Sequence, residues 1–225
     1  MLKLMECEKN DLRALAAELF EHNFKQAITC RIDKDGYPRY QVRRWEEEHL
    51  EDMEEMGVEL FCGATRVVIS SYDDDWVLKF DIQHPDHTCS YNEREAENFQ
   101  KACEAGLDEY FAAMYYIGEV CGVKVYAQEK VNMDEDKVSD EWADYLVSCG
   151  DYDECETEEE KYDAASYDIY DMDQDERVYA MLGSGCESDR VICFLDDNSI
   201  NDLHAANWGY RSGNLEPVMV DYAGF

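Results

Sequence analysis

The chain has little positive charge and no long apolar run. Its 225 residues include 20 Lys and Arg against 54 Asp and Glu, which gives a formal net charge of −34 at pH 7. Phosphate contacts need clustered basic side chains, so this scarcity excludes direct nucleic-acid binding. No apolar run approaches the roughly eighteen residues of a membrane span, and the first residues lack the apolar core of a secretory signal. We therefore expect a cytoplasmic protein without a membrane segment.

Paired cysteine motifs are also absent. The ten cysteines are scattered, none forms a CxxC pair, and the five histidines are too few near them for a zinc site. In a reducing compartment such cysteines stay unpaired. We expect free thiols, many of them buried as small hydrophobic side chains.

The acidic excess allows three interpretations. The simplest is a solvated acidic surface that favours solubility, over a core built from the 45% of hydrophobic residues. A second is a protein that mimics the charge of nucleic acid. A third is a surface that binds a basic protein partner.

The first part of the chain, residues 1–57, predicts helices. Apolar residues recur at helical spacing after Asn10, a good N-cap, and a very acidic helix is expected over residues 45–56 with Gly57 as its stop. We expect an N-terminal helical extension to which no chemistry can be assigned.

Residues 58–131 predict an α+β lobe. Short β-rich runs cover residues 58–63, 65–72 and 75–82, a helix covers 92–105, and two more strands lie within 114–131. Five antiparallel strands with one helix after the third form a lobe of their own.

Residues 132–225 predict a mostly helical region. A helix is expected from Ser139 to Gly150, and a last strand over 217–220. Between them, residues 151–176 are acidic and interleaved with tyrosine, which indicates a solvated helix or flexible insertion outside the core.

The last residues carry the most specific motif. In INDLHAANWGYRSGNLEPVMVDYAGF, Asn207 follows Asp202 by five positions, and Asp221 comes fourteen positions later behind an apolar strand. Carboxylate and amide oxygens are the ligands of hard divalent cations, which neutralise the phosphates of a nucleotide. The pattern resembles the catalytic loop and metal-binding turn of the protein-kinase-like superfamily, in its compact bacterial and phage form. This implies that Asp202 orients the attacking hydroxyl as catalytic base and that Asn207 and Asp221 bind Mg²⁺.

The resemblance extends upstream in the expected order. Lys79 ends the third strand in VLKF, and Glu95 follows sixteen residues later on the next helix. The resemblance implies that Lys79 grips the phosphates of ATP and pairs with Glu95. Glu93 and Glu97 are alternatives for the acidic partner, because the whole helix is acidic.

Further cofactor-binding positions are implied by the same resemblance. Gly63 in GATRVV would be a reduced glycine-rich loop, with an ordinary turn as the alternative. The backbone of Glu129 and Val131 would meet the adenine, and Val67 and Leu78 would cover its ring. For these four positions the alternative is a plain role in the core.

The resemblance covers residues 63–225 and predicts a protein-kinase-like two-lobed α+β fold with a truncated helical C-lobe. Asn201 stands where an arginine often precedes the catalytic aspartate, and no substrate-binding helices follow Asp221. We expect an ATP·Mg-dependent phosphotransferase of unknown acceptor. The alternative is an inactive pseudokinase or acidic binding module, a decoy for a basic protein partner.

Overall fold

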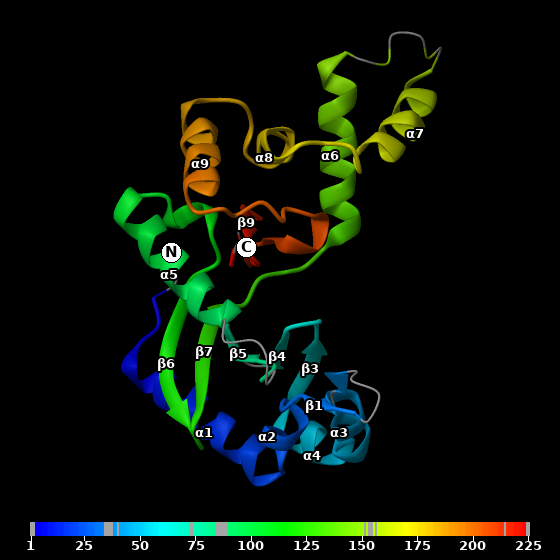
Figure 1. Cartoon of the computed structure of the whole chain (residues 1–225). Helices are drawn as coiled ribbons and strands as arrows, with labels where there is room; N and C mark the ends of the chain where they lie inside the picture. Colours follow the sequence, from blue (N-terminus) through cyan, green and yellow to red (C-terminus); the bar gives the residue numbers. More distant parts are fainter. Residues whose placement is uncertain are drawn as a thin grey trace. The chain divides into compact units, whose positions relative to one another are not determined.

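The computed structural model describes residues 3–33, 38–39, 41–72, 74–83, 90–150, 152, 155, 157–213 and 215–223. The chain divides into two compact units, drawn in Figure 1. The first comprises Met1–Gln100 and Ala113–Lys130, and the second comprises Lys101–Ala112 and Val131–Phe225. None of the described helices has the length and apolar character needed to cross a membrane.

A five-stranded antiparallel sheet forms the centre of the first unit, in the order β3-β4-β5-β7-β6. Its strands are β3 (Val58–Cys62), β4 (Arg66–Ser71), β5 (Trp76–Asp81), β6 (Met114–Val120) and β7 (Val123–Glu129). Helix α5 (Tyr91–Ala105) follows β5, the third strand of the sheet along the chain. The prediction of an α+β arrangement with five antiparallel strands and this helix is confirmed.

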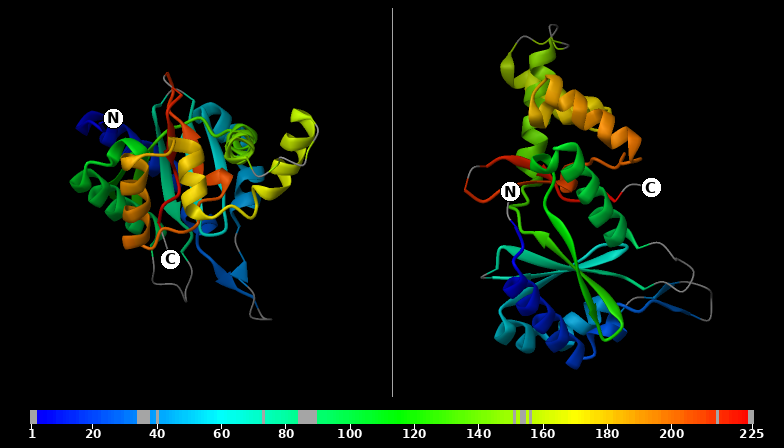
Figure 2. Two further views of the ribbon diagram at one scale, coloured as in Figure 1. Left: turned by 90° about the horizontal axis from the view of Figure 1, so that it is seen from above. Right: turned by 90° about the vertical axis from the view of Figure 1, so that its left-hand side faces the viewer.

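The two faces of this sheet are covered by different helices. Consecutive residues of a strand point to opposite faces. On β5, Lys79 points to one face and contacts Glu95 of α5. The next residue, Phe80, points to the other face, where its ring packs on Phe20 and Phe24 of the N-terminal segment. Figure 2 shows the N-terminal helices in blue on one side of the sheet and α5 in green on the other.

The N-terminal helices are part of this unit. They are α1 (Glu6–Glu21), α2 (Phe24–Ala27), α3 (Val42–Glu48) and α4 (Leu50–Met56), and a short sheet pairs β1 (Arg31–Ile32) with β2 (Pro38–Arg39). Helix α1 packs against β6 and β7, and α3 and α4 pack against β3. The helices described within residues 1–57, which we expected as an N-terminal helical extension, therefore pack on the sheet and belong to the same unit.

Two boundaries in this segment differ from expectation. Helix α1 begins at Glu6 after Met5, whose backbone N–H donates to the Glu8 carboxylate at 2.6 Å, so Asn10 lies inside the helix. The acidic helix over residues 45–56 is interrupted at His49, which separates α3 from α4. Gly57 ends α4 at φ 65°, a conformation that glycine adopts without strain, as predicted.

The second unit combines helices with a small hairpin. Its elements are η1 (Asp108–Tyr110), α6 (Glu135–Cys149), α7 (Glu158–Asp168), α8 (Gln174–Leu182), α9 (Cys186–Asp197), η2 (Ala205–Asn207), β8 (Trp208–Tyr210) and β9 (Pro217–Met219). The predicted last strand is confirmed as β9, and α6 begins four residues before Ser139 because Asp134 accepts from the Lys137 N–H at 3.1 Å. Phe111 joins the core by packing on Phe194 and Tyr222.

The acidic segment 151–176 is only partly as expected. Tyr167 and Tyr170 are each 80% exposed, which agrees with a solvated helix. Ala165, Ile169 and Met172 are buried, so the prediction that the segment lies outside the core is wrong at these positions. The buried residues recur three or four positions apart along α7 (Glu158–Asp168) and the residues that follow it, and the side of the segment that carries them is removed from water.

The cysteines are unpaired over the part of the chain that the structure describes. Nine of them are free, and Cys89 lies outside the described residues. Of these nine, Cys30 is buried, Cys62 and Cys155 are half-buried, and the other six are exposed. The expectation of free thiols agrees with this arrangement, whereas the expectation that many are buried is wrong.

We expect Phe24→Ala to lower the free energy of unfolding by about 3–5 kcal/mol, the usual cost of deleting a buried phenyl ring. Phe24 has no exposed surface, and its ring contacts Trp45 at 4.8 Å and Phe80 at 5.3 Å between centroids. The control Phe61→Ala removes a ring that is 54% exposed and should change stability by less than about 0.5 kcal/mol. Urea unfolding followed by circular dichroism measures both, and equal losses would contradict this packing.

Candidate functional site

A buried ion pair joins β5 to α5 in the first unit. Lys79 Nζ lies 2.6 Å from Glu95 Oε2, and the Glu95 side chain has no exposed surface. Of the alternatives on the same helix, Glu93 pairs with Lys124 near the surface at 2.7 Å, and Glu97 is exposed. Glu95 is therefore the acidic partner of Lys79, as the sequence predicted.

Two further side chains complete this cluster, and sequence reasoning missed both. Arg66 Nη1 donates to Glu95 Oε2 at 3.0 Å, and Gln128 Nε2 donates to Glu95 Oε1 at 3.1 Å. Gln128 Oε1 also accepts from Lys79 Nζ at 3.1 Å. Both oxygens of the buried carboxylate are thus satisfied, which offsets the desolvation that burying charges costs.

Two ion pairs hold this four-residue cluster together. They join the Arg66 and Lys79 side chains to the one carboxylate of Glu95. Tyr126 lies opposite Lys79 in the sheet, and burial raises the pKa of its phenol, so this neighbour stays neutral. A positive group held between a strand and a helix is suited to bind an anion such as a phosphate.

Strand register corrects the residues that share a face with Lys79. Val68 pairs directly with Lys79, and Val77 pairs with Gln128, so both valines lie on the face that carries the cluster. Val67 is fully buried on the opposite face, which the N-terminal helices cover. The prediction that Val67 lines the nucleotide site is therefore wrong, and the same holds for Leu78. Alternation counted outward from Lys79 was the sequence signal that could have found Val68 and Val77.

The other nucleotide positions have structural roles in their own units. Gly63 is exposed between β3 and β4, and its N–H donates to the Arg66 carbonyl at 2.9 Å, which makes it an ordinary turn residue. The Glu129 carboxylate accepts from the Ala113 N–H at 3.1 Å. Val131 packs in the second unit against a cluster that includes Val218. Adenine binding by the backbone of Glu129 and Val131 stays a prediction.

The hairpin β8–β9 brings distant parts of the second unit together. Trp208 pairs with Met219. One position farther toward the open end, the Val220 N–H donates to the Asn207 carbonyl at 2.9 Å. Asn207 and Asp221, fourteen residues apart in sequence, therefore lie on neighbouring positions at the open end of the hairpin. Both side chains carry oxygen atoms of the kind that a hard cation takes as ligands.

The loop before the hairpin is tied to Asn207. Asn207 Nδ2 donates to the backbone carbonyl of Asp202, so the amide oxygen Oδ1 is the atom left to ligate a cation. Asn207 is buried, Asp221 is half-buried, and the Asp202 side chain is exposed, with His204 Nε2 3.9 Å from its Oδ1. One amide and one carboxylate oxygen beside an exposed carboxylate fit the preference of Mg²⁺ for oxygen donors.

The turn that carries Asp221 is anchored from behind. Tyr222 is fully buried, its hydroxyl donates to the Ala112 carbonyl, and its ring packs on Phe111. Gly224, which completes the predicted D-Y-A-G turn, lies outside the described residues. The mounting of Asp221 on β9 and Tyr222 gives its carboxylate a rigid base.

We expect Glu95→Gln to lower the free energy of unfolding by about 3 kcal/mol or more, because it removes the carboxylate charge that pairs with the buried Lys79 and with the half-buried Arg66. Glu93→Gln on the same helix is the matched control. It weakens an exposed pair with Lys124 and should cost at most about 1 kcal/mol. Thermal and urea unfolding of both variants test this, and a Glu95→Gln variant as stable as the control would show that the cluster contributes little.

Comparison of the chain with protein-family models, with curated proteins and with solved structures found no match in any of the three. The functional assignment therefore depends on the geometry of two sets of side chains. One is the buried cluster of Arg66, Lys79, Glu95 and Gln128, and the other is the oxygen-bearing group of Asp202, Asn207 and Asp221.

Proposed function

We propose that the chain is a kinase-like protein that binds ATP with Mg²⁺ and transfers a phosphoryl group to an acceptor. The observation that carries this proposal is the buried pair of Lys79 and Glu95, 2.6 Å apart on the third strand and the following helix of a five-stranded antiparallel sheet. This is the arrangement expected for the N-lobe of the family that the motifs resemble.

A stability argument alone does not account for the cluster. Buried ion pairs are often no more stabilising than apolar side chains of similar volume. Two basic side chains that meet at one point of a chain of net charge −34 suit an anionic ligand. In this proposal Lys79 binds the phosphates, Glu95 and Gln128 hold its ammonium group in place, and Arg66 adds a second positive charge.

The second unit supports the metal-binding part of the proposal. Asn207 and Asp221 would hold Mg²⁺, which when bound neutralises charge on the phosphates. Asp202 would orient the acceptor hydroxyl and accept its proton. The exposure of its side chain agrees with a group that must reach a substrate.

A second candidate function is favoured by the surface of the second unit. Tyr167 and Tyr170 are each 80% exposed at the end of the acidic helix α7. Exposed aromatic side chains surrounded by carboxylates suit a basic protein partner, because tyrosine supplies contact area and the acids supply complementary charge. In this reading the chain is a pseudokinase or acidic binding module.

We expect ATP and Mg²⁺ together, and neither alone, to raise the unfolding temperature. Binding to the native state at a hundredfold excess over Kd stabilises by about 2.7 kcal/mol, which a thermal-shift assay detects. Asp221→Asn should abolish this Mg-dependent shift, because it removes the carboxylate that would hold the metal. Asp197→Asn, an exposed residue at the end of α9, is the control and should leave the shift unchanged.

The outcomes separate the two functions. A shift with ATP turnover that Asp202→Ala abolishes supports the phosphotransferase. A shift whose turnover does not depend on Asp202 indicates a nucleotide-binding pseudokinase. No shift in any condition would contradict nucleotide binding and leave the acidic binding module as the better explanation.

A further inference from the structure

A second cluster of metal-ligating side chains lies among the N-terminal helices, apart from the residues assigned to nucleotide binding. His22, His49 and Asp52 each offer one ligand atom, and these three atoms lie within 4.8 Å of one another. His22 follows the last residue of α1, His49 joins α3 to α4, and Asp52 lies in the first turn of α4. The end of α1, the junction of α3 with α4 and the first turn of α4 thus bring together ligands that are up to thirty positions apart in the sequence.

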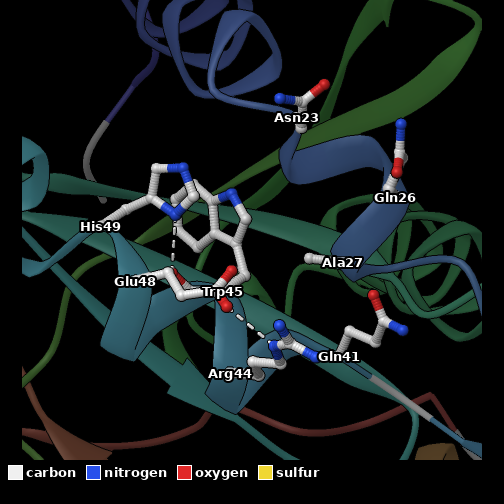
Figure 3. A pocket seen from close by; sticks show the side chains of 8 residues that line it. All are labelled: Asn23, Gln26, Ala27, Gln41, Arg44, Trp45, Glu48 and His49. Carbon is white, nitrogen blue, oxygen red and sulfur yellow. Dashed lines mark hydrogen bonds and ion pairs between the residues drawn. The ribbon is translucent and has the colours of Figure 1, made fainter.

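His49 is held in an orientation that suits a metal ligand. Its Nδ1 lies 2.8 Å from the Trp45 carbonyl, and its ring stacks on the Trp45 indole at 4.7 Å with an angle of 16° between planes. A carbonyl oxygen only accepts, so Nδ1 is the donor in this contact, and Nε2 is the ring nitrogen left to bind a metal. A backbone carbonyl that binds the second ring nitrogen is the usual support of a metal-bound histidine. Figure 3 shows the imidazole lying against the indole.

The same tryptophan positions His22. Trp45 Nε1 donates to the His22 carbonyl at 2.6 Å, which joins the end of α1 to α3. The His22 and His49 rings lie 5.9 Å apart at 87°, and His22 Nδ1 is 3.2 Å from Asp52 Oδ2. Trp45 therefore holds the His49 ring and the backbone of His22, and the Asp52 carboxylate lies beside the His22 ring.

We propose that His22, His49 and Asp52 bind a divalent transition metal of the Zn²⁺ class. Two imidazole nitrogens and one carboxylate oxygen are a donor set that Zn²⁺ accepts and that Mg²⁺ does not favour. Metal–ligand bonds of about 2.0–2.1 Å place the ligand atoms of a tetrahedral site about 3.3 Å apart. The three ligand atoms here lie within 4.8 Å of one another, so they must move closer together to bind a metal. His22 and Asp52 are half-exposed, so their side chains can close on a metal while Trp45 holds His49.

The fourth coordination position would be open to water or a small ligand. Of the three proposed ligands, His49 lines a cavity of about 300 Å³, whose walls also include Gln41, Arg44, Trp45 and Glu48. Figure 3 shows amide and charged side chains around it, with Arg44 paired to Glu48 at 2.8 Å. A three-ligand metal beside a polar cavity has the form of a site that keeps one exchangeable position. The bound metal would also connect α1 to α3 and α4, which cover the sheet.

The test uses Co²⁺ as a spectroscopic probe of the Zn²⁺ site in the full chain. Excess Mg²⁺ is present throughout, so that sites made only of oxygen ligands are already filled. We expect one equivalent of Co²⁺ to give the visible absorption of a nitrogen-containing tetrahedral site and Zn²⁺ to displace it. His49→Ala, His22→Ala and Asp52→Asn should each weaken binding by about 100-fold or more, while His204→Ala, an exposed histidine of the second unit, should not.

Two further measurements keep the test decisive. The double variant His84→Ala/His87→Ala should keep the signal, because these histidines are not part of the proposed site. Circular dichroism of the metal-free variants shows whether each variant folds. If His49→Ala does not fold, Asp52→Asn and His22→Ala provide the test, because they alter half-exposed side chains. An unchanged Co²⁺ spectrum in the folded variants, its loss in the His84/His87 double variant, or no tetrahedral spectrum at all would overturn the proposal.

Discussion

The first unit depends on one buried carboxylate. Glu95 has no exposed surface, and it accepts hydrogen bonds from Arg66 on β4, Lys79 on β5 and Gln128 on β7. Because these strands are neighbours in the sheet, a single side chain of α5 joins the helix to three strands at once. Two cations and an amide surround its charge and offset the cost of removing it from water. The positions of α5 and of the Lys79 side chain are thus two consequences of one interaction.

The charge of the chain makes this cluster unusual. Most of the acidic side chains are exposed, where salt screens their charges over about 8–10 Å. A phosphate near Lys79 and Arg66 would therefore experience mainly the nearby positive groups, and the distant acids would weaken binding without preventing it. In the proposed function, Asn207 and Asp221 would supply oxygen ligands to the cation that accompanies the phosphates.

Trp45 plays a comparable organising role among the N-terminal helices. It stacks on His49, donates to the His22 carbonyl and contacts Phe24 edge-on at 4.8 Å. Phe24 in turn packs on Phe80 of β5, the neighbour of Lys79 in sequence. The histidine and aspartate cluster is thereby built on the same packed layer that covers the back of the sheet. Aromatic side chains provide this because they bury a large apolar area while their polar atoms still reach a backbone partner.

The sequence by itself determined the elements and the principal pair. The strands of the sheet, helix α5, the stop at Gly57 and the final strand follow from local periodicity and turn residues, which act over a few positions. The resemblance of the motifs implied the pairing of Lys79 with Glu95, with Glu93 and Glu97 as alternatives. Only the tertiary structure decided that Arg66 and Gln128, 29 and 33 positions from Glu95, join the same carboxylate. It also decided that Val67 faces the N-terminal helices and that Ala165, Ile169 and Met172 are buried. These outcomes depend on strand order, on register and on which surfaces meet, and local backbone preferences do not determine any of the three. A shift of one residue in register, for example, exchanges the two faces of a strand without changing its local sequence.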